Sequence, residues 1–276
     1  MARAVRCGVR GAARRPALRA WFCAALLAWG RAEVSGAQAA SFVPGARVAL
    51  PALPGLTLAW NDCAGGAGAI SNLPYACSGE ADTLTLYCAL AVSQSIASVI
   101  SAEVVVDIQH ASPVLPDWWQ LGGAGVAGCR PGALSTSYDF SSAPGCTDAW
   151  QSFGFGGIQG FSVGPLGNQA RIKAVASVTS DHAVTLNPGI QYGLLKLRIA
   201  SPRTTGPNAC AGCAAAACLV FQSVILRVIP GSGNDVLIGE AASPSADFAT
   251  YQGTAADCNT VPAHHSSWGT LKALYR

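Results

Sequence analysis

Hydrophobic and polar residues alternate with a period of two along much of this chain. In the segment 191–200, Lys196 and Arg198 stand between leucines and an isoleucine, and the segment 102–109 has a similar pattern. Side chains of a β-strand point to opposite faces in turn, so this alternation predicts strands with one face in the core and one face in water.

Similar runs predict further strands at 46–50, 56–60, 83–92, 171–179, 219–228, 235–240 and 248–252. Turn-forming sequences separate them, among them Pro54-Gly55 and Gly231-Ser-Gly-Asn234, which is expected to close a hairpin. No long amphipathic helix alternates with these strands, which argues against an α/β sheet. We therefore expect an all-β fold, an antiparallel β-sandwich with long loops stapled by disulfides.

The longest irregular stretch runs from about residue 112 to residue 169 and is rich in glycine, serine and tryptophan. Loops of this length are commonly functional or held by cross-links. We expect a single β-sandwich domain over residues 40–276, with this stretch as its loop region.

The first 39 residues have the parts of a secretory signal peptide. Six arginines precede a short apolar segment, Ala20–Gly30, and Ala37-Gln38-Ala39 matches a small-residue cleavage site. We expect cleavage after residue 39, which places the mature chain in the periplasm, at the cell surface or outside the cell.

The net charge changes once this leader is removed. The full chain has 17 Lys+Arg against 14 Asp+Glu, but seven of the basic residues and one of the acidic residues lie in the first 39. The mature chain is therefore slightly acidic and offers no basic patch to a nucleic acid. Hydrophobic residues make up 51% of the chain and charged residues 11%, which excludes a disordered protein. No apolar run reaches the ~18 residues that an integral membrane span needs.

Nine of the 11 cysteines follow the leader, and in an exported protein their default state is a disulfide. The disulfide candidates are Cys63, Cys77, Cys129, Cys146, Cys210, Cys213, Cys218 and Cys258. Cys88 lies in an apolar alternating run and is expected to stay free as a small buried hydrophobe. The local pairs Cys63–Cys77 and Cys129–Cys146 would each close a short loop. The last four cysteines allow three pairings, which the sequence leaves open.

Other cysteine chemistry is an alternative. Cys210-Ala-Gly-Cys213 is a C-x-x-C motif, and His264 and His265 follow Cys258, so a structural zinc site or a thiol redox centre is conceivable. An oxidising compartment favours disulfides instead, and the motif follows prolines in an expected loop. We expect no metal and no cofactor.

The candidate ligand contacts are tryptophans and their polar neighbours. Trp118 and Trp119 lie between Asp117 and Gln120, and successive side chains of an extended backbone point to opposite sides. One indole would then fill the core, and the other would stack on a sugar ring while Asp117 and Gln120 bind hydroxyl groups. Trp60 is a further candidate. The alternative is that both adjacent rings pack beneath the loop, as large aromatic side chains usually do.

No set of residues specifies catalysis. Gly160-Phe-Ser-Val-Gly164 matches G-x-S-x-G, but a nucleophile elbow needs a buried strand before it and a helix after it, and the glycine-rich neighbours favour a loop. Paired carboxylates could serve a glycosidase. No spacing rule links the acids and the histidine expected near strand ends, which are Asp107, His110, Asp117, Asp148 and Asp257.

Several short motifs occur together in the chain. They are WNDC at 60–63, LPDWWQ at 115–120, Cys129-Arg130, CTDAW at 146–150, CAGC at 210–213 and WGTLKALYR at 268–276. As a set they resemble a group of uncharacterised secreted proteins of environmental bacteria over nearly the whole mature chain. Cys88 departs from that pattern, which has an aliphatic residue there. The layout also resembles cohesin-like and carbohydrate-binding β-sandwiches, a likeness of fold that implies no site.

These patterns predict an exported, non-catalytic β-sandwich that binds a glycan or an envelope component, or that builds a structure outside the cell. One alternative is a secreted, glycosidase-like hydrolase that uses loop carboxylates. Another is a subunit of a surface layer or filament, which would self-associate.

Overall fold

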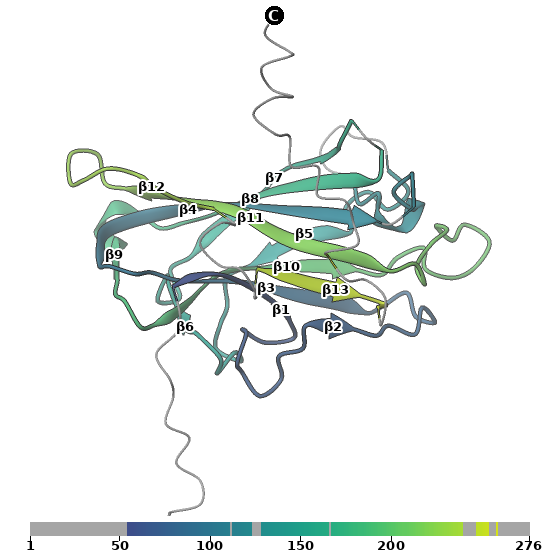
Figure 1. The fold of residues 1–276 in the computed structure, drawn as a ribbon, viewed down its shortest axis with the longest axis horizontal. Coiled ribbons are helices and arrows are strands. Elements are labelled where there is room, and N and C mark those ends of the chain that lie inside the picture. Colours follow the sequence, from purple (N-terminus) through teal and green to yellow (C-terminus); the bar gives the residue numbers. More distant parts are fainter. Residues whose placement is uncertain are drawn as a thin grey trace, which may run out of the picture. The chain divides into compact units, whose positions relative to one another are not determined.

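A computed structural model describes residues 54–110, 112–122, 128–165, 167–239, 247–253 and 258. Within these ranges the chain forms strands and two short 3-10 helices, and no α-helix. The strands form two sheets that lie one above the other (Figure 1). The predicted all-β sandwich is therefore confirmed.

The first sheet has five strands, in the order β1-β3-β10-β5 with β6 beside β10. These strands are β1 (Gly55–Trp60), β3 (Thr83–Ala91), β5 (Leu134–Ser137), β6 (Thr147–Asp148) and β10 (Gln191–Ala200). All pairs are antiparallel except the two-residue pair of β6 with β10.

The second sheet has eight strands, in the order β2-β13-β11-β4-β8-β7, with β12 beside β11 and β9 beside β4. They are β2 (Asn72–Leu73), β4 (Ile96–His110), β7 (Phe155–Val163), β8 (Gln169–Ser177), β9 (Val184–Leu186), β11 (Ala217–Val228), β12 (Val236–Gly239) and β13 (Phe248–Tyr251). Only the short β13–β2 pair is parallel.

The alternation read from the sequence decides which side chains fill the space between the sheets. The valines and the isoleucine at alternate positions of β4 are buried in the main core. Glu103 and Asp107 point away from it and form ion pairs with Arg227 and Arg171 of the neighbouring strands. Burying apolar area in this way is the main stabilising contribution to such a fold.

Lys196 on β10 departs from the predicted pattern, because it is buried and not in water. Its ammonium lies 5.4 Å from the ring centroid of Tyr87 and 5.5 Å from that of Phe140. These two rings belong to a second small core on the outer face of the five-stranded sheet. Burial lowers the pKa of Lys196. The prediction failed because the loop that carries Phe140 and Ala143 covers this face of the sheet.

The stretch 112–169 is not irregular throughout, since it contains β5, β6 and β7. Alternation is hidden in β7 because glycines occupy positions 156, 157 and 160, and in β5 because its sequence is Leu-Ser-Thr-Ser. The G-x-S-x-G motif falls at the end of β7 and in the turn after it, so the expectation of a simple loop there was also wrong.

All eight candidate cysteines form disulfides, and Cys88 is free and buried, as predicted. The pairs are Cys63–Cys146, Cys77–Cys213, Cys129–Cys210 and Cys218–Cys258. The expected local pairs Cys63–Cys77 and Cys129–Cys146 are wrong. The observed partners are 40 to 136 positions apart, because strand pairing brings distant segments of the chain together.

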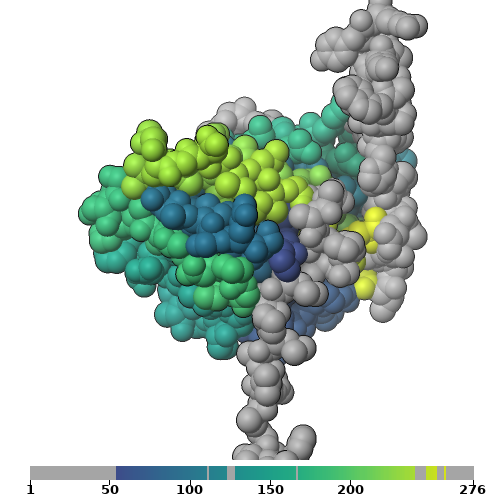
Figure 2. Space-filling model, turned by 60° about the vertical axis from the view of Figure 1, so that its left-hand side comes forward, coloured from purple at the N-terminus to yellow at the C-terminus, as the bar shows by residue number. Residues whose placement is uncertain are grey.

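The hairpin predicted at 231–234 is present, since β11 and β12 are antiparallel neighbours on either side of it. Figure 2 shows this hairpin in yellow-green above the blue segment that joins β3 to β4. An apolar groove lies between these segments and the start of β1. Leu237 at this place is 68% exposed.

Several predictions fall outside the described residues, namely the signal peptide at 1–39, the strand at 46–50, Asp257, His264, His265 and the motif at 268–276. In the part of the chain that is described, no helix is long and apolar enough to cross a membrane.

Candidate functional site

The three tryptophans predicted to contact a ligand are all buried, with no exposed surface. The Trp60 indole N–H donates to the Thr250 carbonyl at 2.8 Å, and that of Trp118 donates to the Thr204 hydroxyl at 3.1 Å. The expectation that either Trp118 or Trp119 lies at the surface is therefore wrong, and the alternative that both rings pack in the interior is confirmed.

The local backbone explains this outcome. Residues 117–119 form a 3-10 helix and not an extended segment, so the two indoles are not directed to opposite sides. The rings of Trp118 and Trp119 meet edge to face, with centroids 5.0 Å apart. The polar neighbours contact each other, since the Gln120 side-chain amide donates to the Asp117 carboxylate at 3.1 Å.

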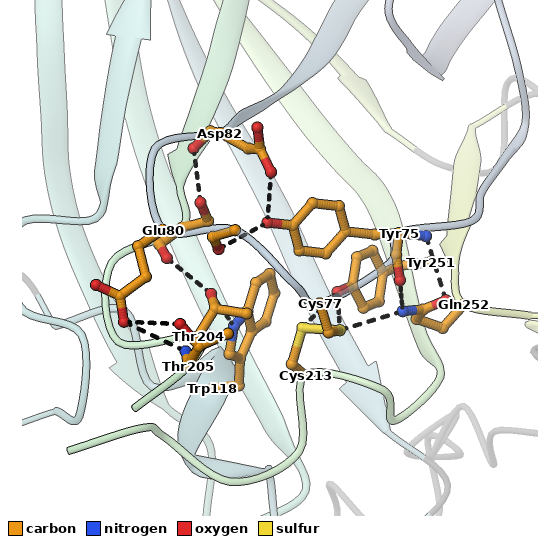
Figure 3. The surroundings of a disulfide bond; sticks show 12 residues. Tyr75, Cys77, Glu80, Asp82, Trp118, Thr204, Thr205, Cys213, Tyr251 and Gln252 are labelled. Atoms are coloured by element: carbon orange, nitrogen blue, oxygen red, sulfur yellow. Dashed lines mark hydrogen bonds between the residues drawn. A yellow bond between two sulfur atoms is a disulfide. The ribbon is translucent and has the colours of Figure 1, made fainter. Parts of the chain in front are cut away.

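Trp118 belongs to a buried aromatic cluster, which we define as Tyr75, Trp118, Trp119, Tyr251 and the guanidinium of Arg130. Trp118 is stacked on Tyr251 with centroids 5.3 Å apart and an interplanar angle of 17°. The Cys77–Cys213 disulfide touches the same tyrosine, whose hydroxyl lies 3.3 Å from the Cys213 sulfur (Figure 3). Aromatic stacking and a cross-link therefore stabilise the same place.

Arg130 carries the one charge in this cluster. Its guanidinium lies 3.7 Å from the centroid of the Trp118 ring and donates to the carbonyls of Trp118, at 2.8 Å, and of Ala200. Burial lowers the pKa of Arg130 to about 10. A buried cation over an indole face is attracted by the ring quadrupole. Through this contact and its two hydrogen bonds, Arg130 ties its own segment to those that contain Trp118 and Ala200.

A second group of rings lies at the surface, and it is the candidate functional site. We call it the aromatic corner and define it as Phe153, Phe155, Asp181 and His182. Phe153 is 51% exposed and Phe155 is 53% exposed. The Phe153 ring is stacked on the His182 ring, with centroids 3.6 Å apart and an interplanar angle of 13°. Exposed rings gathered in this way commonly mark a binding surface.

Strand register brings these residues together from distant parts of the chain. Phe155 begins β7 and pairs with Ser177, the last residue of β8. The chain continues from β8 into the second 3-10 helix, Ser180–His182. The residue two positions before Phe155 therefore meets His182.

The loop that carries Phe153 is held rigidly. Trp150 is fully buried, and its indole N–H donates to the Leu194 carbonyl at 2.6 Å. The two carboxylate oxygens of Asp148 accept the backbone N–H groups of Trp150 and Ser152 at 2.8 and 2.7 Å. Gln151 and Ser152 both have positive φ, 52° and 70°. Strained backbone of this kind persists where its surroundings fix it and is frequent at functional sites.

The corner combines the apolar face of an aromatic ring with the hydrogen-bond acceptor oxygens of the Asp181 carboxylate. The Thr179 hydroxyl donates to Asp181 and lowers the pKa of that carboxyl group, so the carboxylate is ionised at neutral pH. One carboxylate oxygen lies 3.6 Å from Nε2 of His182. A flat ring beside hydrogen-bond acceptors suits a ligand with C–H groups on one face and hydroxyl groups at its rim.

The acids considered for a hydrolase that lie within the described residues have structural partners. Asp107 binds Arg171 through both oxygens at 2.7 Å, and Asp148 holds the Phe153 loop. His110 is buried, and its Nδ1 accepts from the Ser112 backbone N–H at 3.0 Å. Among the residues that the structure describes, no three or more His, Cys, Asp or Glu side chains gather in a way that could hold a metal ion.

Comparisons of the chain with protein-family models, with curated proteins and with solved structures found no match. Sequence reasoning missed Phe153 and His182, because the strand register that joins them is set by β7, which has no visible alternation. The available signal was the placement of Phe153 in the stretch 112–169, which was expected to be functional.

Proposed function

We propose that this protein is an exported, non-catalytic β-sandwich that binds glycans through the aromatic corner. The observation that carries the proposal is the stack of Phe153 on His182 at the surface, in a loop that is held by buried Trp150. Exposed aromatic side chains on a rigid support bind at a small entropic cost, because little has to be ordered when the ligand arrives.

The chemistry of the corner matches a sugar ring. The apolar face of a pyranose packs on an aromatic ring, and its hydroxyl groups donate to carboxylate oxygens such as those of Asp181. Export is supported by four disulfides in a chain whose first 39 residues have the pattern of a signal peptide.

The test is an array of neutral and acidic oligosaccharides probed with the mature protein, followed by calorimetry with the best of them. We expect Phe153→Ala to weaken binding at least about tenfold, which corresponds to ~1.4 kcal/mol. Asp181→Asn is expected to weaken binding less, because it removes charge and keeps one acceptor oxygen. The matched control is Leu237→Ala, which removes an exposed apolar side chain elsewhere.

Three outcomes would reject the proposal: no array signal with folded protein, a Phe153→Ala variant that binds like the wild type, or an equal loss in Leu237→Ala. Mass spectrometry of the exported chain tests the second half of the proposal. The mature protein should begin after residue 39 and contain one free thiol, that of Cys88.

A further inference from the structure

The outer face of β7, at the edge of the eight-stranded sheet, has open space above two glycines (Figure 1). Strand register places Gly157 opposite Val175 and Gly160 opposite Lys173, so both glycines face away from the buried alanines of β8. A Cβ added at either glycine would meet no described atom within 4 Å, and neither glycine has a positive φ. Glycine inside a strand commonly marks a place where a ligand approaches the backbone closely.

This open face continues directly from the aromatic corner. Phe155 lies on the same outer face, two positions before Gly157, and is 53% exposed. A bulge before Gly160 leaves Gln159, which is exposed, without a partner residue on β8. We call these four residues the β7 strip, and they are Phe155, Gly157, Gln159 and Gly160. The strip thus has an aromatic ring at one end and accessible backbone with a polar amide beyond it.

A cation without a partner lies beside the far end of the strip. Lys173 of β8 is exposed, and it forms no ion pair with any residue that the structure describes. The carboxylates of the next strand, β4, are already occupied, since Asp107 binds Arg171 and Glu103 binds Arg227. The strip itself contains no charged residue. The local charge is therefore positive, and it is complementary to an anionic group.

The two ends of this surface have opposite charges and lie too far apart for one sugar ring. The strand partners of Phe155 and Gly160 are four positions apart on β8, which is roughly 13 Å of extended backbone. In the aromatic corner the Asp181 carboxylate is ionised and would repel an anion. A ligand that contacts both ends therefore has several linked units, with its anionic group away from the corner.

We propose that the glycan bound by the aromatic corner is a linear acidic polysaccharide whose chain continues along the β7 strip. One sugar ring packs on Phe155, the next units lie over Gly157 and Gly160, and a carboxylate or sulfate group of the chain binds the Lys173 ammonium. This inference rests on the proposed function, because it extends the same site.

The first test compares chain length and charge. The probes are neutral hexose, uronate and sulfated oligosaccharides of two to eight units, on an array and then in calorimetry. We expect the acidic series to bind most tightly, with an affinity that rises at least about tenfold from two units to six. Separate uronate and sulfated series show which anionic group Lys173 binds.

The second test fills the open space. Gly157→Leu should remove the gain in affinity with chain length and leave binding of the disaccharide unchanged, because Phe153 and His182 are kept. Binding of the disaccharide also shows that the variant is folded. The matched control is Gly239→Leu on β12, where the nearest neighbour of the added Cβ is 3.9 Å away, and it should bind like the wild type.

The third test removes the cation. Lys173→Gln should weaken binding of the acidic hexasaccharide by about two- to fivefold, as expected for one exposed ion pair, and leave the neutral hexasaccharide unchanged. Added salt should reduce the same difference by screening. Arg198→Gln is the matched control, because Arg198 is an exposed cation on β10 of the other sheet.

The failure of this inference is distinct from the failure of the proposed function. Tightest binding by neutral chains, or an affinity that does not rise with chain length, overturns the inference and leaves glycan binding at the corner intact. The inference is also overturned if Gly157→Leu or Lys173→Gln binds the acidic chain like the wild type, or if its matched control loses as much. No signal from any glycan with folded protein rejects both proposals.

Discussion

The molecule has two groups of aromatic residues in opposite environments. The buried aromatic cluster around Trp118 is closed by a disulfide and by the Arg130 guanidinium, and none of its tryptophans is exposed. The aromatic corner has one stacked pair, Phe153 on His182, with half of the Phe153 surface in water. Similar ring stacking therefore lies in the core in the first group and at an exposed surface in the second.

This contrast shows that residue type alone does not identify a binding ring. Tryptophan is the side chain most suited to sugar stacking, yet each described tryptophan of this protein is in the core. Trp150 connects the two roles, since its buried indole supports the loop that exposes Phe153. The following predictions test the contrast, from the largest expected effect on stability to the smallest.

Trp118→Ala should destabilise the protein most. It removes a fully buried indole, its stack on Tyr251 and the ring beneath Arg130. We expect a loss of about 3–5 kcal/mol in the free energy of unfolding, measured by urea denaturation. A loss below about 1 kcal/mol would contradict the view that this cluster holds the fold together.

Removal of the Cys77–Cys213 cross-link should have the next largest effect. The double variant Cys77→Ser/Cys213→Ser releases a loop of 136 positions, and disulfides of this kind contribute about 2–4 kcal/mol. Urea denaturation without reductant measures the loss. Cys88→Ala is the control, because it changes a buried cysteine that has no partner and should cost about 1 kcal/mol.

Acid should destabilise the protein through His110. Burial lowers the pKa of this histidine from its ordinary value of 6.5, so the folded state holds it neutral. The unfolded chain binds a proton first, and stability is therefore lost as the pH falls through 6.5 toward the folded pKa. His110→Asn should flatten the dependence of the unfolding free energy on pH in that window. If the slope of the unfolding free energy against pH is unchanged in the variant, groups other than His110 cause the loss of stability in acid.

Phe153→Ala should have the smallest effect on stability, below about 0.5 kcal/mol, because half of the side chain is already in water. The same substitution should abolish most glycan binding. Denaturation and calorimetry on one preparation would show both results. A large loss of stability would show that Phe153 holds the fold together, as the buried aromatic cluster does, and would remove the main argument for the aromatic corner as a binding surface.

The strands were predictable wherever side chains alternate. β4, β8, β10 and β11 have apolar residues at every second position, and the structure has strands at these places. β7 was not predictable, because its glycines have no side chain to show which face is buried. Lys196 was assigned to water because alternation shows two faces but not whether a loop covers the outer one.

The candidate site was less predictable than the fold. The state of every described cysteine could be predicted from the sequence, whereas the disulfide partners depend on strand order, which the spacing of cysteines along the chain does not contain. The direction of Trp118 and Trp119 depends on a single helical turn in place of an extended segment. Phe153 and His182 meet only after β7 and β8 have paired.

The overlap of two disulfide loops has a consequence for how the chain responds to proteolysis. The loops closed by Cys63–Cys146 and Cys77–Cys213 overlap, so every peptide bond from 63 to 213 lies inside at least one of them. A single cut anywhere in this interval leaves the two fragments covalently joined. The chain can therefore be nicked in an exposed loop and still remain one molecule.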